Sequence, residues 1–267
     1  AEEILNNAQE AVGEDPEISD KLYEITGKQP ETKLENKYFK DGSLKVEYEY
    51  DERELLVKET YYNTDGSLSY YLTYEYNENN NLIKLESYDS AGNLEMYYTY
   101  EYDESGNLAK RSLYIPAMEQ YELGSLSSYT TYEYDQNGQL TKASEHNANG
   151  TLALVTEYGE DGNRMKTDYY VDNSVSEYST YEYDENGNEA KRSDYYADGS
   201  LKWYYVYEYD ENGNQIKGSR YDQNNSMMDY WTNEYDELGN QVRMNNYDKD
   251  GNLEYTTEYD ETGNVIN

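Results

Sequence analysis

Cysteine is absent from the 267 residues of this chain, and histidine and phenylalanine occur once each. The lack of cysteine excludes disulfide bonds and thiolate metal sites. A single histidine leaves no material for a histidine-based metal site or a histidine-activated nucleophile. The sequence also has no apolar run of about 18 residues, the length typical of a membrane-spanning helix. We therefore expect no cofactor, no metal ion and no direct insertion into a membrane.

Positive charge is scarce as well, because 21 lysine and arginine residues stand against 57 aspartate and glutamate residues, a net charge of −36. Such a field repels phosphate backbones and anionic lipid headgroups, so nucleic-acid and membrane-surface partners are not expected. Tyrosine, in contrast, occurs 38 times. The other apolar residues are too few for a thick two-layer core. A ring with a polar hydroxyl suits surfaces that are only half buried.

One short motif recurs along the chain and identifies a repeat protein. Its clearest copies are YTYEYDESGNLAK at 98–110, STYEYDENGNEAK at 179–191 and YVYEYDENGNQIK at 205–217. One residue marks each copy, at positions 42, 54, 66, 80, 92, 106, 124, 138, 150, 162, 173, 187, 199, 213, 225, 239, 251 and 263. This marker residue is glycine except at Glu54, Asn80, Asn173 and Asn225. Fifteen of the seventeen intervals are 12 or 14 residues, which gives a 26-residue repeat. This regularity argues against disorder, the alternative that low hydrophobicity and high charge favour.

Each marker residue is predicted to close a β-hairpin. In Asp210-Glu211-Asn212-Gly213, aspartate suits the first position of a type I turn, and glycine suits the left-handed residue that follows. The two together close a hairpin with a bulge. Glu54 fits a left-handed position poorly, so we expect its hairpin to be distorted. The predicted fold is all-β, with tandem hairpins in a single elongated, twisted or spiralling antiparallel sheet.

Side chains alternate between the two faces of a strand, so even intervals keep equivalent residues on one face. Tyrosine stands four residues before most markers, and in the clearest copies a second tyrosine stands six residues before, as Tyr102 and Tyr100 do, with glutamate between them, as Glu101 does. The turn type predicts that Tyr102 lies opposite Leu108 and that Tyr100 lies opposite Lys110, whose stem would cover the ring.

Two intervals break the pattern. The interval between Gly162 and Asn173 is 11 residues, the only odd value. An odd interval reverses the faces of everything beyond it, so we predict a compensating bulge or shortened turn near 169–174. The interval after Gly106 is 18 residues, and we predict an extended loop at 115–118.

The N-terminal residues lack the motif and define the predicted domain organisation. Residues 1–13 and 16–26 have helical patterns with suitable capping residues. We predict a helical cap or linker over 1–30, which would cover the first sheet edge, and one repeat domain over 31–267. A chain that starts at Ala1 rather than methionine is expected to be a mature exported protein or a trimmed chain.

The repeat unit resembles the YD repeats of the RHS family, whose signature runs Tyr-x-Tyr-Asp-x-x-Gly-Arg-Leu. The match lies at Tyr100, Tyr102, Asp103, Gly106 and Leu108, recurs at Tyr132, Tyr134, Asp135, Gly138 and Leu140, and extends over roughly residues 37–267. The resemblance implies a spiralling β-sheet in an exported bacterial protein, extracellular or at the cell surface, where a trimmed lipoprotein is one form. Asparagine or serine stands where the family has arginine, so the resemblance does not imply toxin delivery.

The acidic turns do not predict a metal site. Glycine follows aspartate by three residues, whereas an EF-hand loop needs ligands at positions 1, 3 and 5 with glycine at 6. Equivalent glutamates recur on every second strand, roughly 10 Å apart, too far for one cation coordinated at about 2.4 Å. His146 holds a position that tyrosine occupies elsewhere, so we interpret it as a substituted sheet residue. Carboxylate pairs for glycoside hydrolysis are too abundant to indicate a site, and the chain is predicted not to be an enzyme.

The tyrosine-bearing face is the one candidate binding surface. Exposed aromatic residues stack on sugars or anchor protein partners. The competing interpretation is that tyrosine only stabilises a sheet that is wet on both sides. The candidate ligand-binding residues are Trp203, Tyr205, Tyr207 and Trp231, with Tyr98 and Tyr100 at equivalent positions of an earlier repeat. Because Tyr205 and Trp231 stand two strands apart, roughly 10 Å, we expect a stepped aromatic strip rather than a pocket.

The predicted function is therefore a non-enzymatic surface scaffold or binding module, monomeric, with a glycan or a protein as its ligand. The alternative is a polysaccharide-active enzyme that uses an acidic pair, and the break in the repeat near Pro116 could host it. A flat aromatic surface favours the first function, and a deep cleft with two carboxylates favours the second.

Overall fold

The computed structural model describes residues 33–39, 42–116, 124–260, 263 and 265–266. Contacts divide the chain into two units, residues 1–128 and 129–267, and each is described by itself. The described residues form eighteen β-strands and no helix, so the all-β class is confirmed, and none of them forms a helix that could cross a membrane. The helical cap over 1–30 lies outside the described residues. The single repeat domain over 31–267 and the elongated, spiralling shape stay predictions.

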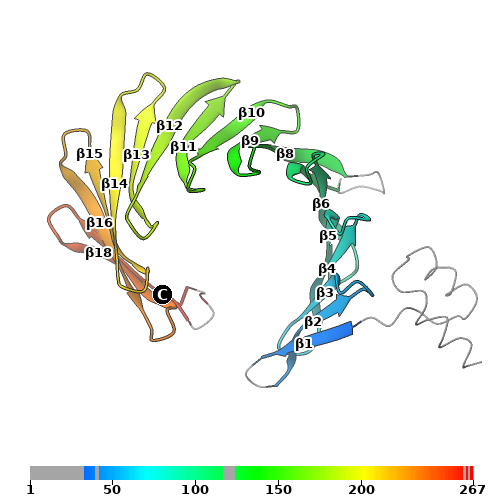
Figure 1. Cartoon of the computed structure of the whole chain (residues 1–267). Helices are drawn as coiled ribbons and strands as arrows, with labels where there is room; N and C mark the ends of the chain where they lie inside the picture. The colour runs from blue at the N-terminus through cyan, green and yellow to red at the C-terminus, as the bar shows by residue number, and fades with distance from the viewer. Residues whose placement is uncertain (1–32, 40–41, 117–123, 261–262, 264, 267) are drawn as a thin grey trace, which may run out of the picture. The chain divides into compact units, whose positions relative to one another are not determined.

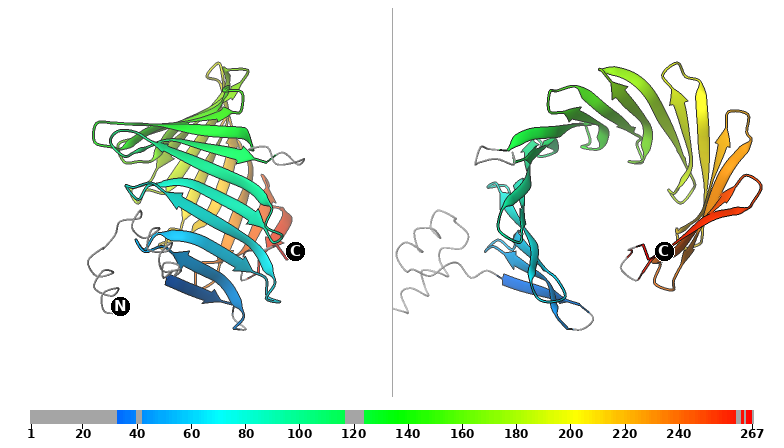
Figure 2. Two further views of the ribbon diagram at one scale, coloured as in Figure 1. Left: turned by 90° about the vertical axis from the view of Figure 1, so that its right-hand side faces the viewer. Right: turned by 180° about the vertical axis from the view of Figure 1, so that it is seen from behind.

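In the first unit each strand pairs with the next to form an antiparallel meander, visible in Figures 1 and 2. The strands are β1 (Lys33–Tyr38), β2 (Leu44–Tyr50), β3 (Leu56–Tyr62), β4 (Leu68–Tyr76), β5 (Leu82–Asp89), β6 (Leu94–Tyr102) and β7 (Leu108–Ile115).

In the second unit the strands from β9 to β18 also pair consecutively and antiparallel (Figure 1). The preceding strand, β8 (Ser125–Tyr134), contains the boundary between the two units. The remaining strands are β9 (Leu140–Asn147), β10 (Leu152–Tyr158), β11 (Arg164–Val171), β12 (Ser174–Tyr183), β13 (Glu189–Tyr196), β14 (Leu201–Tyr209), β15 (Gln215–Asp222), β16 (Met227–Tyr235), β17 (Gln241–Asp248) and β18 (Leu253–Glu258).

Seventeen of the eighteen marker residues have a left-handed backbone, so they form turns as predicted. In a representative turn, the Gly106 N–H donates to the Asp103 carbonyl at 3.0 Å, and the Asp103 N–H donates to the Asn107 carbonyl at 2.9 Å. The exception is Gly124, whose predicted left-handed conformation was wrong; residues 117–123, which include part of the extended loop predicted at 115–118, lie outside the described residues. A Cβ at Gly124 would lie 3.2 Å from the main chain at 115–116, so this glycine permits a close approach of the backbone.

Glu54 does not distort its hairpin, contrary to the expectation from its residue type. It adopts the left-handed conformation with φ 59°. The Glu54 N–H donates to the Asp51 carbonyl at 3.0 Å, and the Asp51 N–H donates to the Leu55 carbonyl at 2.8 Å. These distances match those of the glycine turns, so the strain is confined to the backbone of one residue.

Replacing Glu54 with glycine is therefore expected to stabilise the protein by about 0.5–1 kcal/mol. A left-handed non-glycine residue costs roughly 1–2 kcal/mol, and the extra freedom of glycine in the unfolded chain offsets roughly 0.5–1 kcal/mol of the gain. Chemical denaturation measures the change in the free energy of unfolding. Asn80→Gly is the matched control, because Asn80 has the same conformation, with φ 61°, and asparagine tolerates it. A Glu54→Gly effect no larger than that of the control would contradict the prediction.

The aspartate and asparagine of the motif hold together the turns that contain both. Asp103 Oδ1 accepts hydrogen bonds from the backbone N–H groups of Ser105 at 2.9 Å and Asn107 at 2.8 Å, and Asp103 Oδ2 accepts one from Asn107 Nδ2 at 3.1 Å. These bonds from the backbone and side chain of Asn107 hold the pKa of Asp103 below its ordinary value. The asparagine that stands in place of the family's arginine thus has a structural role in the turn.

A second bulge, one residue beyond the turn, changes the predicted cross-strand pairs. Leu108 lies opposite Tyr102 as expected, but the register then shifts, so that Lys110 lies opposite Glu101 and not Tyr100. The predicted tyrosine–lysine pairs were therefore wrong. The lysines form ion pairs with the glutamates, at N–O distances of 2.7–3.7 Å, in Glu49–Lys58, Glu75–Lys84, Glu101–Lys110, Glu133–Lys142, Glu182–Lys191 and Glu208–Lys217. Such exposed pairs contribute about 0–1 kcal/mol each.

Tyrosine lies on both faces of the sheet, so the expectation that even intervals keep equivalent residues on one face was wrong: Tyr88 and Tyr102 each stand four residues before a marker, and they lie on opposite faces. We call the side with Tyr100, Tyr102 and their equivalents the tyrosine face, and the side with Glu101 and its equivalents the glutamate face. On the glutamate face, tyrosines of paired strands stack with ring centroids 4.6–5.0 Å apart, in Tyr71–Tyr88, Tyr97–Tyr114, Tyr178–Tyr195, Tyr204–Tyr221 and Tyr230–Tyr247. His146 stacks on Tyr129 at 4.4 Å in the same way, so its interpretation as a substituted sheet residue is confirmed.

On the tyrosine face, the tyrosine before the turn anchors its hairpin to the preceding one in four hairpins. The Tyr102 hydroxyl donates to the Leu82 carbonyl at 2.8 Å. The same bond recurs at 2.9–3.0 Å in Tyr76–Leu56, Tyr209–Glu189 and Tyr235–Gln215. Phenylalanine could not make this bond, which explains why the repeat uses tyrosine.

The odd interval is compensated where the sequence predicted. Strands β11 and β12 are joined by a two-residue turn at Asp172 and Asn173, both left-handed, with φ 51° and 60°. The register then shifts between Tyr169 and Tyr170. Ser176 is the additional residue on β12, and its hydroxyl donates to the Tyr169 carbonyl at 3.1 Å. The same kind of bulge follows the regular turns, but only four residues separate the paired Tyr170 and Val175, against five between Tyr102 and Leu108. This shorter turn restores the tyrosine face for all later strands.

Candidate ligand-binding surface

The aromatic residues singled out in the second unit lie on the tyrosine face of strands β14 and β16. Trp203, Tyr205 and Tyr207 alternate along β14, and Trp231 lies on β16. The Tyr205 and Tyr207 ring centroids are 6.3 Å apart, and Trp231 contacts both edge-on, at 6.3 and 6.2 Å. All four side chains are half-buried. We call Tyr205, Tyr207 and Trp231 the aromatic cluster.

A glycine on the intervening strand allows the cluster to form. Gly218 on β15 lies opposite both Tyr207 and Trp231. A Cβ at this position would lie 2.1 Å from the Trp231 ring, so the ring rests directly on the Gly218 backbone. The sequence predicted that Tyr205 and Trp231 would lie roughly 10 Å apart, as steps of a strip. The rings are instead in contact, because the strand between them has no side chain at Gly218.

Arginines alternate with tyrosines across the strands beside the cluster. In register, Tyr181 lies opposite Arg192, Arg192 opposite Tyr205, and Tyr205 opposite Arg220. The Arg192 guanidinium lies 4.5 Å from the Tyr205 ring centroid, and the Arg164 guanidinium lies 4.5 Å from that of Tyr181. Half of the chain's six arginines therefore lie along one row of the tyrosine face.

Each of these arginines has a carboxylate partner. The pairs are Arg164–Glu189 at 3.1 Å, Arg192–Asp194 at 3.1 Å and Arg220–Asp229. Trp203 Nε1 also donates to Asp194 Oδ2, at 2.7 Å. Burial raises the pKa of Tyr207 to about 12, further above neutral pH than that of an exposed tyrosine. The row therefore presents aromatic rings and polar groups with little net charge.

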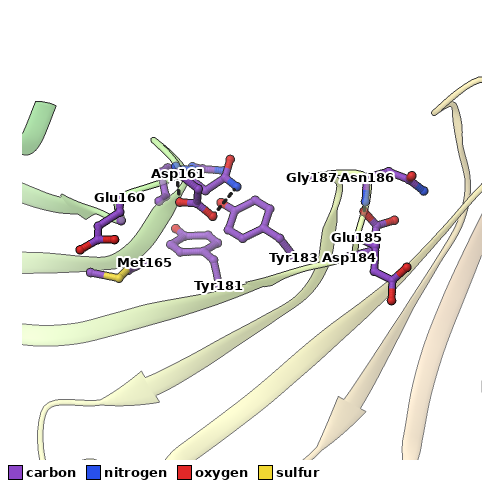
Figure 3. Close-up of a pocket in the computed structure, with 12 residues that line it drawn as sticks. Glu160, Asp161, Met165, Tyr181, Tyr183, Asp184, Glu185, Asn186 and Gly187 are labelled. Carbon is purple, nitrogen blue, oxygen red and sulfur yellow. Dashed lines mark hydrogen bonds between the residues drawn. The ribbon is translucent and has the colours of Figure 1, made fainter. Parts of the chain in front are cut away.

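A hollow of about 800 Å³ opens beside this row, between the turns at 159–163 and 184–187. Figure 3 shows the rings of Tyr181 and Tyr183 pointing into the space between Asp161 and the second turn. Arg164 lines the hollow as well, and its guanidinium stacks on Tyr181. We call this hollow the turn cleft.

The aspartates of the turn cleft are held by their own turns. Asp161 Oδ1 accepts from the Asn163 N–H at 3.0 Å, and Asp184 Oδ1 accepts from the Asn188 N–H at 2.8 Å. Hydrogen bonds from Asn163 and Asn188 lower the pKa of Asp161 and Asp184 respectively. A glycosidase needs one carboxyl group whose pKa is raised, so that it donates a proton. Burial raises the pKa of nearby Glu189, but Glu189 is paired with an arginine.

The sequence reasoning missed the turn cleft, although a signal was present. Arg164 stands two residues after its marker, where Leu82 and Leu108 stand in regular repeats. This replacement lies next to the only odd interval of the chain. A charged residue at a leucine position, beside a change in spacing, could have indicated that regular packing stops there.

Tyr98 and Tyr100 occupy equivalent positions in the first unit. Their ring centroids are 6.4 Å apart with a 36° tilt, and the Arg111 guanidinium lies 5.4 Å from the Tyr98 ring centroid. They repeat the local arrangement of Tyr205 and Tyr207 without a tryptophan. In the part of the chain that the structure describes, no group of three or more acidic or histidine side chains is placed to hold a metal ion.

The turns, the bulges and the consecutive pairing define a tandem β-hairpin repeat protein. No family model matches the chain, and no curated protein matches it. Among solved structures, it is similar to the TcdB2–TccC3–TEV crystal structure, with 12% identity, a TM-score of 0.29 and coverage of 91% of this chain and 17% of that one. It is also similar to the Tc holotoxin pore of Photorhabdus luminescens, with 11% identity, a TM-score of 0.21 and coverage of 87% and 18%.

A porin-like protein from Bacteroides uniformis is a further similar structure, with 13% identity, a TM-score of 0.34 and coverage of 81% of this chain and 87% of that one. The chain spans less than a fifth of the length of the TcdB2–TccC3–TEV structure and of the Tc holotoxin pore. The RHS family therefore stays a resemblance carried by the repeat motif.

Proposed function

We propose that this chain is a non-enzymatic repeat protein that binds an extended ligand, a glycan or a protein segment, on the tyrosine face of its second unit. The observation that supports it most is the aromatic cluster, where three half-exposed rings are in mutual contact beside arginines that already have carboxylate partners. Clustered tryptophan and tyrosine residues dominate binding hot spots. Export to a bacterial cell surface is part of the proposal and rests on the resemblance to YD repeats.

The cluster differs from the tyrosines that stabilise the sheet. Tyr76, Tyr102, Tyr209 and Tyr235 on this face donate their hydroxyl groups to the backbone of the preceding hairpin. Trp231 makes no such bond to a carbonyl, and it lies over a glycine instead of a side chain. The repeat motif does not require a tryptophan ring that packs on the backbone of a glycine. A binding surface explains this arrangement better.

Loss of both tryptophans is expected to abolish binding on a glycan array. The wild-type protein should bind at least one class of oligosaccharide, and Trp203→Ala/Trp231→Ala should bind none, because stacking surface is lost at both ends of the β14–β16 patch. Tyr230→Ala is the matched control: Tyr230 neighbours Trp231 on the same strand but faces the other way, where it stacks on Tyr247. Binding that survives the double substitution would place the ligand elsewhere, and a wild-type protein that binds neither glycan nor protein would leave only the scaffold role.

The alternative function, a polysaccharide-active enzyme, has two observations to draw on. The turn cleft carries carboxylates, and Glu189 beside it has a raised pKa. The lowered pKa of Asp161 and Asp184 and the ion pair of Glu189 argue against a proton donor. The predicted location near Pro116 adjoins residues 117–123, which lie outside the described residues. The wild-type protein would be an enzyme if it released reducing ends from a bound glycan and Glu189→Gln did not.

A further inference from the structure

We propose that the turn cleft and the aromatic cluster are the two ends of one binding path, which takes a neutral, unbranched oligosaccharide lying across strands β12 to β16. The inference rests on the proposed function and specifies its ligand. It assigns a role to Tyr183 and Tyr181 that the repeat pattern does not require.

The two ends are joined by a continuous row of side chains. Tyr181 lines the cleft and lies opposite Arg192, and Arg192 stacks on Tyr205 of the cluster. All three project from the same face, because cross-strand partners share a face. From β12 to β16 the path crosses four inter-strand steps, roughly 19 Å at about 4.8 Å each. A single sugar ring cannot span that length, so the path suits a chain of several.

The chemistry of the path favours a neutral chain. Its arginines are already paired with Glu189, Asp194 and Asp229, so no cationic group is left to neutralise an acidic polymer. The cleft rim adds Glu160 and Glu185, and the chain as a whole carries a net charge of −36. Acidic sugars are therefore repelled. Hydroxyl groups can share the existing donors and acceptors, and aromatic rings offer stacking faces of the kind sugars use.

The direction of the path follows from the same geometry. Along β14 the rings of Tyr205 and Tyr207 are 6.3 Å apart, and Trp231 closes the row at β16. A ligand running along β14 would meet Trp203, Tyr205, Tyr207 and the Trp231 ring that contacts them, but not the cleft. A ligand running across the strands contacts the cleft, the arginine row and the cluster in turn.

Isothermal titration with glucose oligomers of defined length tests the inference. The probes are cellobiose and cellohexaose, with a galacturonic acid hexamer and a chitosan hexamer as acidic and basic counterparts. We expect cellohexaose to bind at least 10-fold more tightly than cellobiose. Tyr183→Ala should remove most of that advantage without changing the affinity for cellobiose, because the shorter chain reaches only the cluster. Glu182→Ala is the control, since Glu182 neighbours Tyr183 on the glutamate face.

The outcomes separate the inference from the proposed function. If Tyr183→Ala leaves cellohexaose binding intact while Trp203→Ala/Trp231→Ala abolishes it, the path is wrong and the binding surface stands. Tighter binding of the acidic or the basic hexamer overturns the neutral ligand. If none of the oligomers binds the wild-type protein, both the inference and the glycan form of the proposed function fail. Circular dichroism of Tyr183→Phe and Tyr183→Ala checks that the hairpin still folds.

Discussion

Gly218→Ala is expected to destabilise the protein by about 1–3 kcal/mol, the usual range for overpacking. The added Cβ would lie 2.1 Å from the Trp231 ring, so the ring must leave its place over β15 and lose its edge contacts with Tyr205 and Tyr207. In an ordinary strand the same substitution is stabilising, because glycine is unfavourable in a strand interior. The sign of the change in unfolding free energy is therefore diagnostic, and chemical denaturation followed by tryptophan fluorescence measures it.

A double-mutant cycle isolates the ring as the cause. In the Trp231→Ala background the Cβ at position 218 loses the three closest contacts, all with the Trp231 ring, so Gly218→Ala should cost much less or become stabilising. Gly106→Ala gives a second comparison, because Gly106 has nothing within 4 Å of its Cβ position but a left-handed φ of 86°. Its cost should be independent of Trp231. An equal effect of Gly218→Ala with and without Trp231 would contradict the packing that the structure shows.

Deletion of Ser176 is expected to destabilise the protein by about 2–4 kcal/mol. Without the additional residue, β12 cannot pair with β11 and also keep its side chains on the faces that β13 requires. The β11–β12 pairing should yield, with loss of cross-strand pairs such as Thr167–Ser179 and of the stacking of Arg164 on Tyr181. Each such pair contributes roughly 0.2–1 kcal/mol. The free energy of unfolding, measured by urea denaturation, should fall accordingly.

The control for the deletion keeps the residue count. Ser176→Ala removes only the hydroxyl bond to the Tyr169 carbonyl and should cost about 1 kcal/mol or less, because Ser176 is exposed. Amide hydrogen exchange should show the deletion opening β11 and β12 while leaving the pairing of β14 to β17 protected. If deletion of Ser176 lowered the free energy of unfolding no more than Ser176→Ala does, this bulge would not determine which residues of β12 lie on each face of the sheet.

The turns were the most predictable part of the fold, because glycine and asparagine at fixed spacing have few other uses. The pattern also located the compensation near 169–174, since an odd interval must be absorbed somewhere. What the pattern could not show was the second bulge after each turn, which moves Lys110 from Tyr100 to Glu101. A bulge of this kind needs no special residue type, as Ala109 at the extra position illustrates.

The candidate site was predictable in its residues but not in its geometry. Composition indicates that Trp203 and Trp231 are unusual in a tyrosine repeat, and alternation places them on one face. The contact between Trp231 and the β14 tyrosines depends on Gly218, a residue that sequence reasoning treats as an interruption of a strand. The turn cleft depends on the packing of two turns that are more than twenty residues apart in sequence. Contacts of this kind depend on which residues lie opposite each other on neighbouring strands, and the second bulge changes that register from the one the sequence predicts.

Fluorine NMR of protein labelled with 5-fluorotryptophan tests the binding surface most directly, because the chain has only two tryptophans. Each resonance reports one end of the β14–β16 patch, and single substitutions assign Trp203 and Trp231. Titration with an oligosaccharide selected on the glycan array should shift both resonances, with one dissociation constant. Saturable binding that leaves both resonances unmoved would place the ligand elsewhere and contradict the proposed surface.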